Sequence, residues 1–285
     1  MIRSLPNSKV YTLCFKIYII LYFVFLFAPL AVTSILAFND SQFPSLPWNG
    51  FSLDWFFADT PSRLGIFHDR MNLDSILVSA ETAFLVSVLA TTVGTLGAFL
   101  FEQEEFRFKQ LLYFLMLLPL VIPGVILGIS ILLFSNTLGT FFEESFNLDV
   151  GLFRPGFWLV VLGQFSFITT FVTLVVSARL KKFDPTLEEA ALNLGANRFE
   201  VIWHITLKFL RPAIIGAAAV AFLMSFENFN TTLFLVGSKP TLPINLYLQV
   251  RDGSTPVINA VSFLMIFGTS ILAFANLYFT RKTGK

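Results

Sequence analysis

The sequence of 285 residues is poor in charge, cysteine and histidine. Only 13% of the residues are charged, roughly half the share of an average soluble domain, and 55% are hydrophobic. So few charges cannot cover a water-soluble surface of this size. Cys14 is the only cysteine, which excludes disulfides and thiolate metal sites within the chain. His68 and His204 lie far apart in the sequence, so we expect no metal site.

Several motifs of enzymes and nucleotide-binding proteins are also missing. The sequence contains no G-x-x-x-x-G-K-[ST] loop, so it offers no cradle for nucleotide phosphates. Neither H-E-x-x-H nor G-x-S-x-G occurs, which argues against a metalloprotease or an esterase-like enzyme. The net charge is +1 and no basic stripe stands out, so a nucleic-acid partner is not expected. We therefore predict a protein that is not an enzyme and uses no cofactor.

What the sequence has instead is a series of long apolar segments separated by polar ones. Each approaches the ~20 residues that an α-helix needs to cross the hydrocarbon core. The first is longer than the roughly 7 to 15 apolar residues of a signal peptide, so we interpret it as a retained span. The pattern predicts an all-α polytopic membrane protein with about six transmembrane helices. The segments are 17–38, 76–101, 111–135, 157–179, 213–236 and 257–279.

The distribution of lysine and arginine predicts the orientation, because cytoplasmic flanks carry the excess of these residues. With the N-terminus inside, 14 of the 19 basic residues fall on the inner side and five on the outer side. Both termini are therefore expected in the cytoplasm. The loop at about 39–75 is then outside, the loop at about 180–211 is inside, and one membrane domain accounts for residues 1–285. The five outer residues are Arg63, Arg70, Arg154, Lys239 and Arg251.

The inner loop is far longer than a simple connection and carries helix signals. Asp184 before a proline predicts one helix start, and Gly195 predicts its end. Asn197, with Glu200 three residues later, predicts the cap of a second helix. Such a helical hairpin exposes small and apolar side chains on the cytoplasmic side, and a partner protein would bury them.

The same loop resembles a known family motif. Glu189-Ala190-Ala191, three residues, Gly195, nine residues, Ile205, one residue and Leu207 is similar to the EAA loop in permease subunits of bacterial ABC importers. The resemblance implies that the loop docks into a groove of the cytoplasmic ATPase, with Glu189, Ala190, Ala191 and Gly195 at the contact. The chain departs from the family pattern at Lys208, where a proline is usual.

The resemblance extends along most of the chain. FLMLLPLVIPGVILGISILLF and SFENFNTTLFLVGSKPTLPINLYLQVRDGSTPVINAVS are similar to the second permease of polyamine (spermidine/putrescine) importers. This implies the type I importer permease fold, the bacterial inner membrane, a second similar permease, an ATPase dimer and a periplasmic binding protein. Related permeases for ferric iron, thiamine, opines and phosphonates share the layout. A secondary transporter or channel remains the alternative, and a homodimer or heterodimer of permeases is equally open.

Two acidic residues fall within the predicted spans, Glu81 and Glu227. An ionisable group at membrane depth costs at least ~2.5 kcal/mol on insertion scales and is by default a functional candidate. Asn228 and Asn230 adjoin Glu227, and Gln164 lies in the fourth predicted span. These residues are candidates for the lining of a cation pathway. The alternative is that Glu227 and its asparagines hydrogen-bond neighbouring helices or the partner permease.

The third predicted span contains residues that change helix geometry. Pro119 and Pro123 should bend it, and Gly124-x-x-x-Gly128 permits close approach of another helix. Packing is the expected role of both features, with a gating hinge as the alternative.

Overall fold

A computed structural model describes residues 9–253 and 255–283, and this part of the chain is mainly helical. Its strands form one small antiparallel hairpin in which Asp59 pairs with Leu64. The predicted all-α class is confirmed. In chain order the elements are α1 (Lys9–Leu36), α2 (Asp54–Phe57), β1 (Asp59–Thr60), β2 (Arg63–Leu64), α3 (Arg70–Gln103), α4 (Lys109–Val121), α5 (Gly124–Phe146), η1 (Gly151–Phe153), α6 (Phe157–Leu180), α7 (Thr186–Asn193), α8 (Arg198–Val201), η2 (Ile202–Thr206), α9 (Leu207–Phe226), η3 (Thr232–Phe234), α10 (Leu242–Gly253) and α11 (Val257–Thr283).

Within the described part, five helical runs are long and apolar enough to cross a membrane: α1, α3, α5, α6 and the run Arg198–Phe226. α4 is shorter but also apolar, as is the Val257–Ile271 part of α11. These helices match the polytopic membrane protein predicted from the sequence.

The helix ends differ from the predicted ones in most spans, and two predicted spans are organised differently. The segment 111–135 is interrupted between α4 and α5, where Ile122 is extended and Pro123 precedes the first residue of α5. A residue before proline is pushed out of the helical region, which explains the break. The predicted span 213–236 is wrong at both ends, because the helical run begins at Arg198, includes Pro212 and stops at Phe226.

The chain divides into two compact units. One comprises residues up to 70 together with 249–271, and the other comprises 71–248 together with the residues after 271. The single domain expected for 1–285 stays a prediction, because two compact units can belong to one membrane domain.

In the first unit, Arg63 organises the segment that follows α1. Its Nη1 donates to Asp40 Oδ1 at 2.5 Å and to Asp54 Oδ2 at 2.7 Å, and its guanidinium lies 5.6 Å from the ring centroid of Trp55. The hydrogen bond with Asp40, followed by that with Asp54, raises the pKa of Arg63 above its ordinary value. The Trp55 indole N–H donates to the carbonyl of Asn39 at 3.1 Å. Residues 39–69 of the predicted loop thus form a folded segment, which we call the folded cap, whereas 70–75 already belong to α3.

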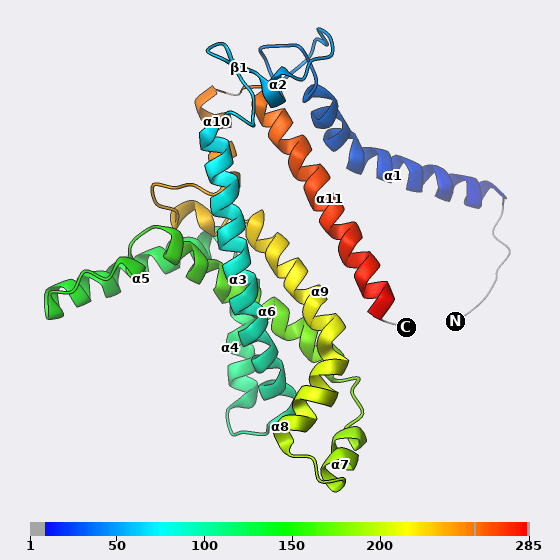
Figure 1. Cartoon of the computed structure of the whole chain (residues 1–285), viewed down its shortest axis with the longest axis vertical. Coiled ribbons are helices and arrows are strands. Elements are labelled where there is room, and N and C mark those ends of the chain that lie inside the picture. The colour runs from blue at the N-terminus through cyan, green and yellow to red at the C-terminus, as the bar shows by residue number, and fades with distance from the viewer. Residues whose placement is uncertain (1–8, 254, 284–285) are drawn as a thin grey trace. The chain divides into compact units, whose positions relative to one another are not determined.

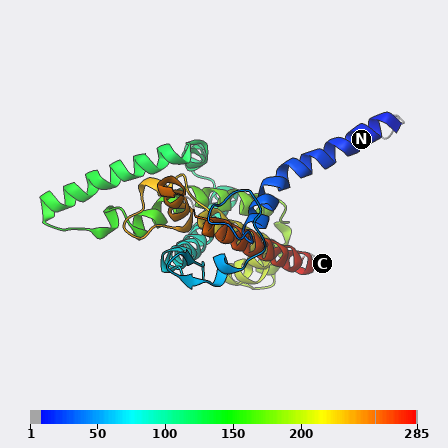
Figure 2. The same cartoon turned by 90° about the horizontal axis from the view of Figure 1, so that it is seen from above.

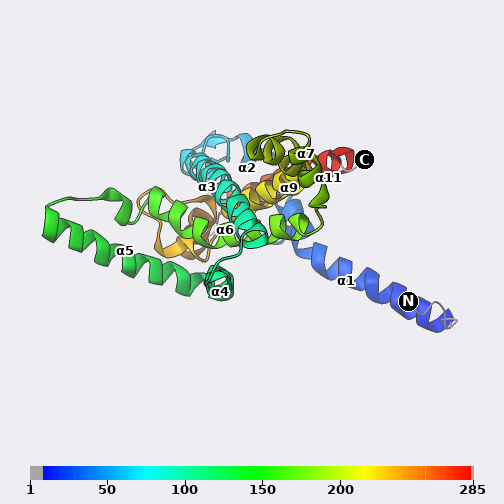
Figure 3. The same ribbon diagram turned by 90° about the horizontal axis from the view of Figure 1, so that it is seen from below.

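The core of the second unit forms where α3, α6 and α9 pack together (Figure 1). Close approach requires small residues: a Cβ at Gly94 of α3 would lie 2.8 Å from the side chain of Val172 on α6. Ser87 of α3 also donates to the carbonyl of Ala218 on α9 at 2.8 Å. Within this unit α5 extends away from these three helices, and the chain returns through η1 to α6 (Figures 2 and 3). The large apolar side chains along α5 are mostly exposed, which suits contact with lipid or a partner.

Candidate functional site

A polar turn follows the last helical residue of α9. Glu227 is the residue that closes the helix, and the chain then turns until η3 begins at Thr232. Glu227 and Asn230 are exposed, and Asn228 is half-buried. Sequence hydropathy predicted that these residues lie inside a continuous span, and the structure places them on non-helical backbone instead. Polar side chains on such a turn can face a solute without distorting a helix.

Gln164 of α6 forms hydrogen bonds with residues at both ends of this turn. Its side chain is fully buried. Its Nε2 donates to Thr232 Oγ1 at 2.8 Å, and its Oε1 accepts a hydrogen bond from the hydroxyl of Ser225 in the last turn of α9. Thr232 Oγ1 in turn donates to Asn228 Oδ1 at 2.9 Å. The four side chains form one continuous chain of hydrogen bonds, which we call the Gln164 relay.

Glycines of α5 and α6 provide the surface on which the turn rests. A Cβ at Gly128 would lie 2.6 Å from the carbonyl oxygen of Thr231, and one at Gly124 would lie 3.0 Å from the Cβ of Asn230. On α6, a Cβ at Gly163 would lie 2.3 Å from Leu235 Cδ1. The Gly124-x-x-x-Gly128 pattern was expected to receive another helix. In this chain the pattern receives the turn.

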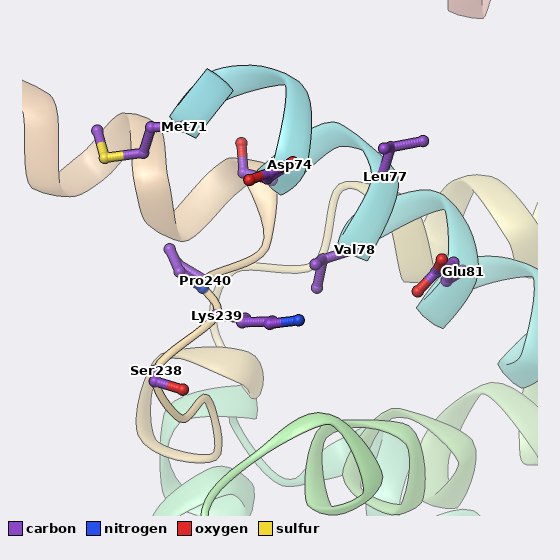
Figure 4. Close-up of a pocket in the computed structure, with 9 residues that line it drawn as sticks. Met71, Asp74, Leu77, Val78, Glu81, Ser238, Lys239 and Pro240 are labelled. Atoms are coloured by element: carbon purple, nitrogen blue, oxygen red, sulfur yellow. The ribbon is translucent and has the colours of Figure 1, made fainter. Parts of the chain in front are cut away.

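Glu81 lines a separate pocket of about 360 Å³. Figure 4 shows α3, which carries Asp74 and Glu81, opposite the loop that carries Ser238 and Lys239. Both carboxylates and the ammonium group are exposed, and no ion pair joins Lys239 to either acid in the part described. Among the described residues, the lining of this pocket includes Glu81 but not Glu227. The structure therefore links Gln164 to Asn228 through Thr232, places Glu227 and Asn230 on the same turn, and places Glu81 elsewhere.

The long inner loop forms the predicted helical hairpin. The carboxylate of Asp184 accepts from the backbone N–H of Thr186 at 3.0 Å, at the start of α7. Gly195, just after α7, has φ +93°, a conformation that other residues adopt at a cost. Asn197 and Glu200 form the predicted reciprocal capping box at the start of α8. The second helix does not end in the loop. It continues through the π-helical turn η2 into α9.

The two adjacent glutamates of α7 have different environments. Glu188 is half-buried and accepts a hydrogen bond from the hydroxyl of Thr206, a residue with no exposed surface. Glu189 and Ala190 are exposed, and Ala191 is half-buried. Glu188 therefore ties α7 to the end of η2, while Glu189 is accessible to a partner.

Large apolar side chains also lie exposed on the hairpin. Leu194 is 89% exposed, Phe199 72% and Trp203 59%, and the rings of Phe199 and Trp203 stack with centroids 6.1 Å apart. The sequence analysis expected exposed apolar side chains on the hairpin but did not assign Phe199 and Trp203 to the contact. The helical spacing of these two residues was the signal that could have identified them.

The described residues offer no cluster suited to a metal ion. Within 9–253 and 255–283, no group of three or more histidine, cysteine, aspartate or glutamate side chains is placed to hold one.

Comparisons with known proteins agree on one kind of protein. Residues 90–284 match the family described as "Binding-protein-dependent transport system inner membrane component". The putrescine transport system permease protein PotI of Escherichia coli (strain K12) is 30% identical over 269 residues, which cover 94% of this chain and 90% of the relative. The spermidine/putrescine transport system permease protein PotC of Haemophilus influenzae is 28% identical over 261 residues, with 91% and 93% covered.

Solved structures show the same fold. A chain of a bacterial ABC transporter involved in the import of the acidic polysaccharide alginate superposes with a TM-score of 0.76 at 19% identity. That superposition covers 98% of this chain and 97% of the other. A chain of the MetNI methionine ABC transporter in an inward-facing conformation gives a TM-score of 0.57 at 16% identity, covering 75% of this chain and 94% of the other.

Proposed function

Because this chain belongs to the family of binding-protein-dependent transport system inner membrane components, we propose that it forms part of the pathway by which a polyamine crosses the bacterial inner membrane. The observation that best supports this proposal is the similarity to PotI along 94% of the chain. A periplasmic binding protein delivers the solute, and a second similar permease completes the pathway. ATP is hydrolysed by a separate ATPase dimer, since the sequence holds no phosphate-binding loop.

The hairpin is the proposed contact with the ATPase. Glu189, Ala190, Ala191 and Gly195 match the family motif, and the first two are exposed at the surface of α7. The exposed apolar side chains of Leu194, Phe199 and Trp203 extend this surface. We place the hairpin and both termini in the cytoplasm, in agreement with the excess of basic residues on that side.

The polar turn is the proposed lining of the pathway. Glu227 supplies a carboxylate, and Asn228 and Asn230 supply amides, which together can replace part of the hydration shell of an ammonium group. A carboxylate in a low dielectric attracts such a group more strongly than it would in water. Glu81, in its own pocket near the start of α3, is proposed to meet the cation earlier on its route. Gln164 belongs to the same region but acts from a buried position.

Glu227→Gln tests this assignment, because it keeps the shape of the side chain and removes the charge. The complete complex is reconstituted in proteoliposomes, and uptake of labelled putrescine is measured together with the ATPase activity stimulated by the loaded binding protein. We expect uptake to fall about tenfold or more, the scale of a hydrogen bond to a charged group, with the complex still assembled. Glu144→Gln is the matched control, since Glu144 is an exposed glutamate of α5 outside the turn. Uptake equal to wild type in the Glu227 variant would contradict the pathway role, and loss of assembly would support interhelical packing instead.

A further inference from the structure

The Gln164 relay joins segments that are distant in the sequence but adjacent at the polar turn. Gln164 lies inside α6, Ser225 in the last turn of α9 and Thr232 at the start of η3. The two residues that Gln164 contacts flank the turn on either side. One buried amide thus fixes the separation of the two ends of the segment that carries Glu227 and Asn228.

From this geometry we propose that Gln164 is a positioning residue, which holds the turn so that Glu227 and Asn228 face the solute. The proposal rests on the proposed function and adds a residue that does not itself touch the cation. Glutamine suits the role because its amide supplies one donor and one acceptor without a charge. Burying a charged side chain at this depth would cost more desolvation free energy than burying the neutral, hydrogen-bonded amide.

The relay also orients the amide of Asn228. Asn228 Oδ1 accepts from Thr232 and has a second lone pair that can accept from an ammonium group. An ammonium group only donates hydrogen bonds, so we expect its acceptors at the turn to be the carboxylate of Glu227, an exposed residue, and this amide oxygen of Asn228. Thr232 is fully buried, so water does not readily replace its hydrogen bonds if Gln164 is removed. Loss of the Gln164 relay should therefore make the turn more mobile, because water does not take over the lost hydrogen bonds.

Three variants test the proposal in the reconstituted complex. Gln164→Leu keeps the volume and removes both hydrogen bonds, Thr232→Val removes the hydroxyl, and Thr232→Ser keeps it. Each is measured for putrescine uptake and for ATPase activity with saturating loaded binding protein. We expect the first two to lower uptake per ATP hydrolysed by about tenfold, the scale of one lost buried hydrogen bond, and Thr232→Ser to stay near wild type.

Thr170→Val is the matched control for buried polarity. Thr170 lies on the same helix, is 2% exposed and donates to the carbonyl of Met116 at 2.7 Å, but it has no contact with the turn among the described hydrogen bonds. Its variant should lower thermal stability without changing uptake per ATP. If it lowers this ratio as much as Gln164→Leu does, the effect is general destabilisation and the positioning role is wrong.

The double variant Gln164→Leu/Glu227→Gln separates this inference from the proposed function. If Gln164 acts through Glu227, the double variant should transport about as well as Glu227→Gln alone, because coupled residues are non-additive. Fully additive losses would overturn the positioning role. Normal transport by Gln164→Leu with impaired transport by Glu227→Gln would overturn it while leaving the pathway intact. Normal transport by Glu227→Gln would reject both.

Discussion

The hydroxyl of Thr206 donates a hydrogen bond to the carboxylate of Glu188, 18 residues earlier in the chain. This contact joins the short helix α7 to the turn that leads into α9, the helix whose other end carries Glu227. The proposed ATPase contact and the proposed pathway residues are therefore linked by one continuous helical run. We expect a displacement of α7 to be transmitted along this run toward the polar turn.

Thr206→Val should weaken the attachment of α7. The variant leaves the half-buried Glu188 carboxylate without this donor, at a cost of about 1 kcal/mol once partial exposure is allowed for. We expect about fivefold less ATPase to co-purify with the permease at limiting concentration, and Thr206→Ser to restore it. Thr137→Val, which loses an exposed bond to a backbone carbonyl on α5, is the control. Unchanged co-purification in Thr206→Val would show that the hydrogen bond does not position α7.

Substitution of Gly195 tests the proposed coupling contact. A Cβ there would meet no atom within 4 Å, so the cost in the isolated chain comes from φ +93° alone and is on the order of 1–2 kcal/mol. The complex that carries Gly195→Asp should hydrolyse ATP without a matching uptake of putrescine, because the hairpin is strained and a charge is added at the contact. Gly216→Ala is the matched control. Gly216 also has open space around it but lies within the helix α9, where alanine is favoured by roughly 0.5–1 kcal/mol. Normal uptake by an assembled Gly195→Asp complex would refute the coupling role.

Gly128→Ala should disrupt the support of the polar turn. The added methyl would lie 2.6 Å from the carbonyl oxygen of Thr231, which is backbone and cannot rotate away. Overpacking of this kind costs typically 1–3 kcal/mol, so we expect a lower melting temperature of the purified complex and reduced uptake. Gly139→Ala is the control. Gly139 lies on the same helix, and the added methyl would make an ordinary 3.4 Å contact with Phe153. Equal stability of the two variants would contradict the close packing at Gly128.

Features that depend on neighbouring residues were predicted well from the sequence. The capping box of Asn197 and Glu200 spans four residues, and the break at Gly195 follows from one residue type, so both were visible locally. Pro123 gave a local signal for a bend in the third span, but the structure shows that the span is interrupted there. These signals, with the apolar lengths, were sufficient for the fold class and the hairpin.

Features that depend on distant residues were not predictable in this way. Gln164 is 61 residues from Ser225 and 68 from Thr232, and hydropathy gives no sign that they meet. Beyond Phe226 the sequence is polar at Glu227, Asn228 and Asn230, but it becomes apolar again at 233–236. The polar residues were therefore interpreted as part of a continuous span, and the end of α9 was missed. The turn forms because glycines of α5 and α6 leave room for its backbone and because Gln164 satisfies its buried hydroxyl groups. Both causes are tertiary contacts between residues that are distant in the sequence.

The proposed orientation predicts which residues a membrane-impermeant thiol reagent reaches in whole cells. In a Cys14→Ser background, a cysteine at Ser45 in the folded cap should be labelled, and one at Asn193 in α7 should be labelled only after permeabilisation. Both positions are exposed in the chain, so accessibility depends on the side of the membrane. Labelling of Asn193→Cys but not Ser45→Cys in intact cells would reverse the topology.

The central claim is that this chain conducts a polyamine in an ATP-driven importer, and transport by the reconstituted system tests it most directly. Proteoliposomes containing both permeases and the ATPase dimer are given ATP inside, and the periplasmic binding protein of the same system with labelled putrescine or spermidine outside. The account predicts ATP-dependent accumulation that stops without the binding protein or with a hydrolysis-deficient ATPase, and no accumulation of thiamine under the same conditions. Accumulation of neither polyamine while another solute is imported, or polyamine uptake that persists without the ATPase, would contradict it.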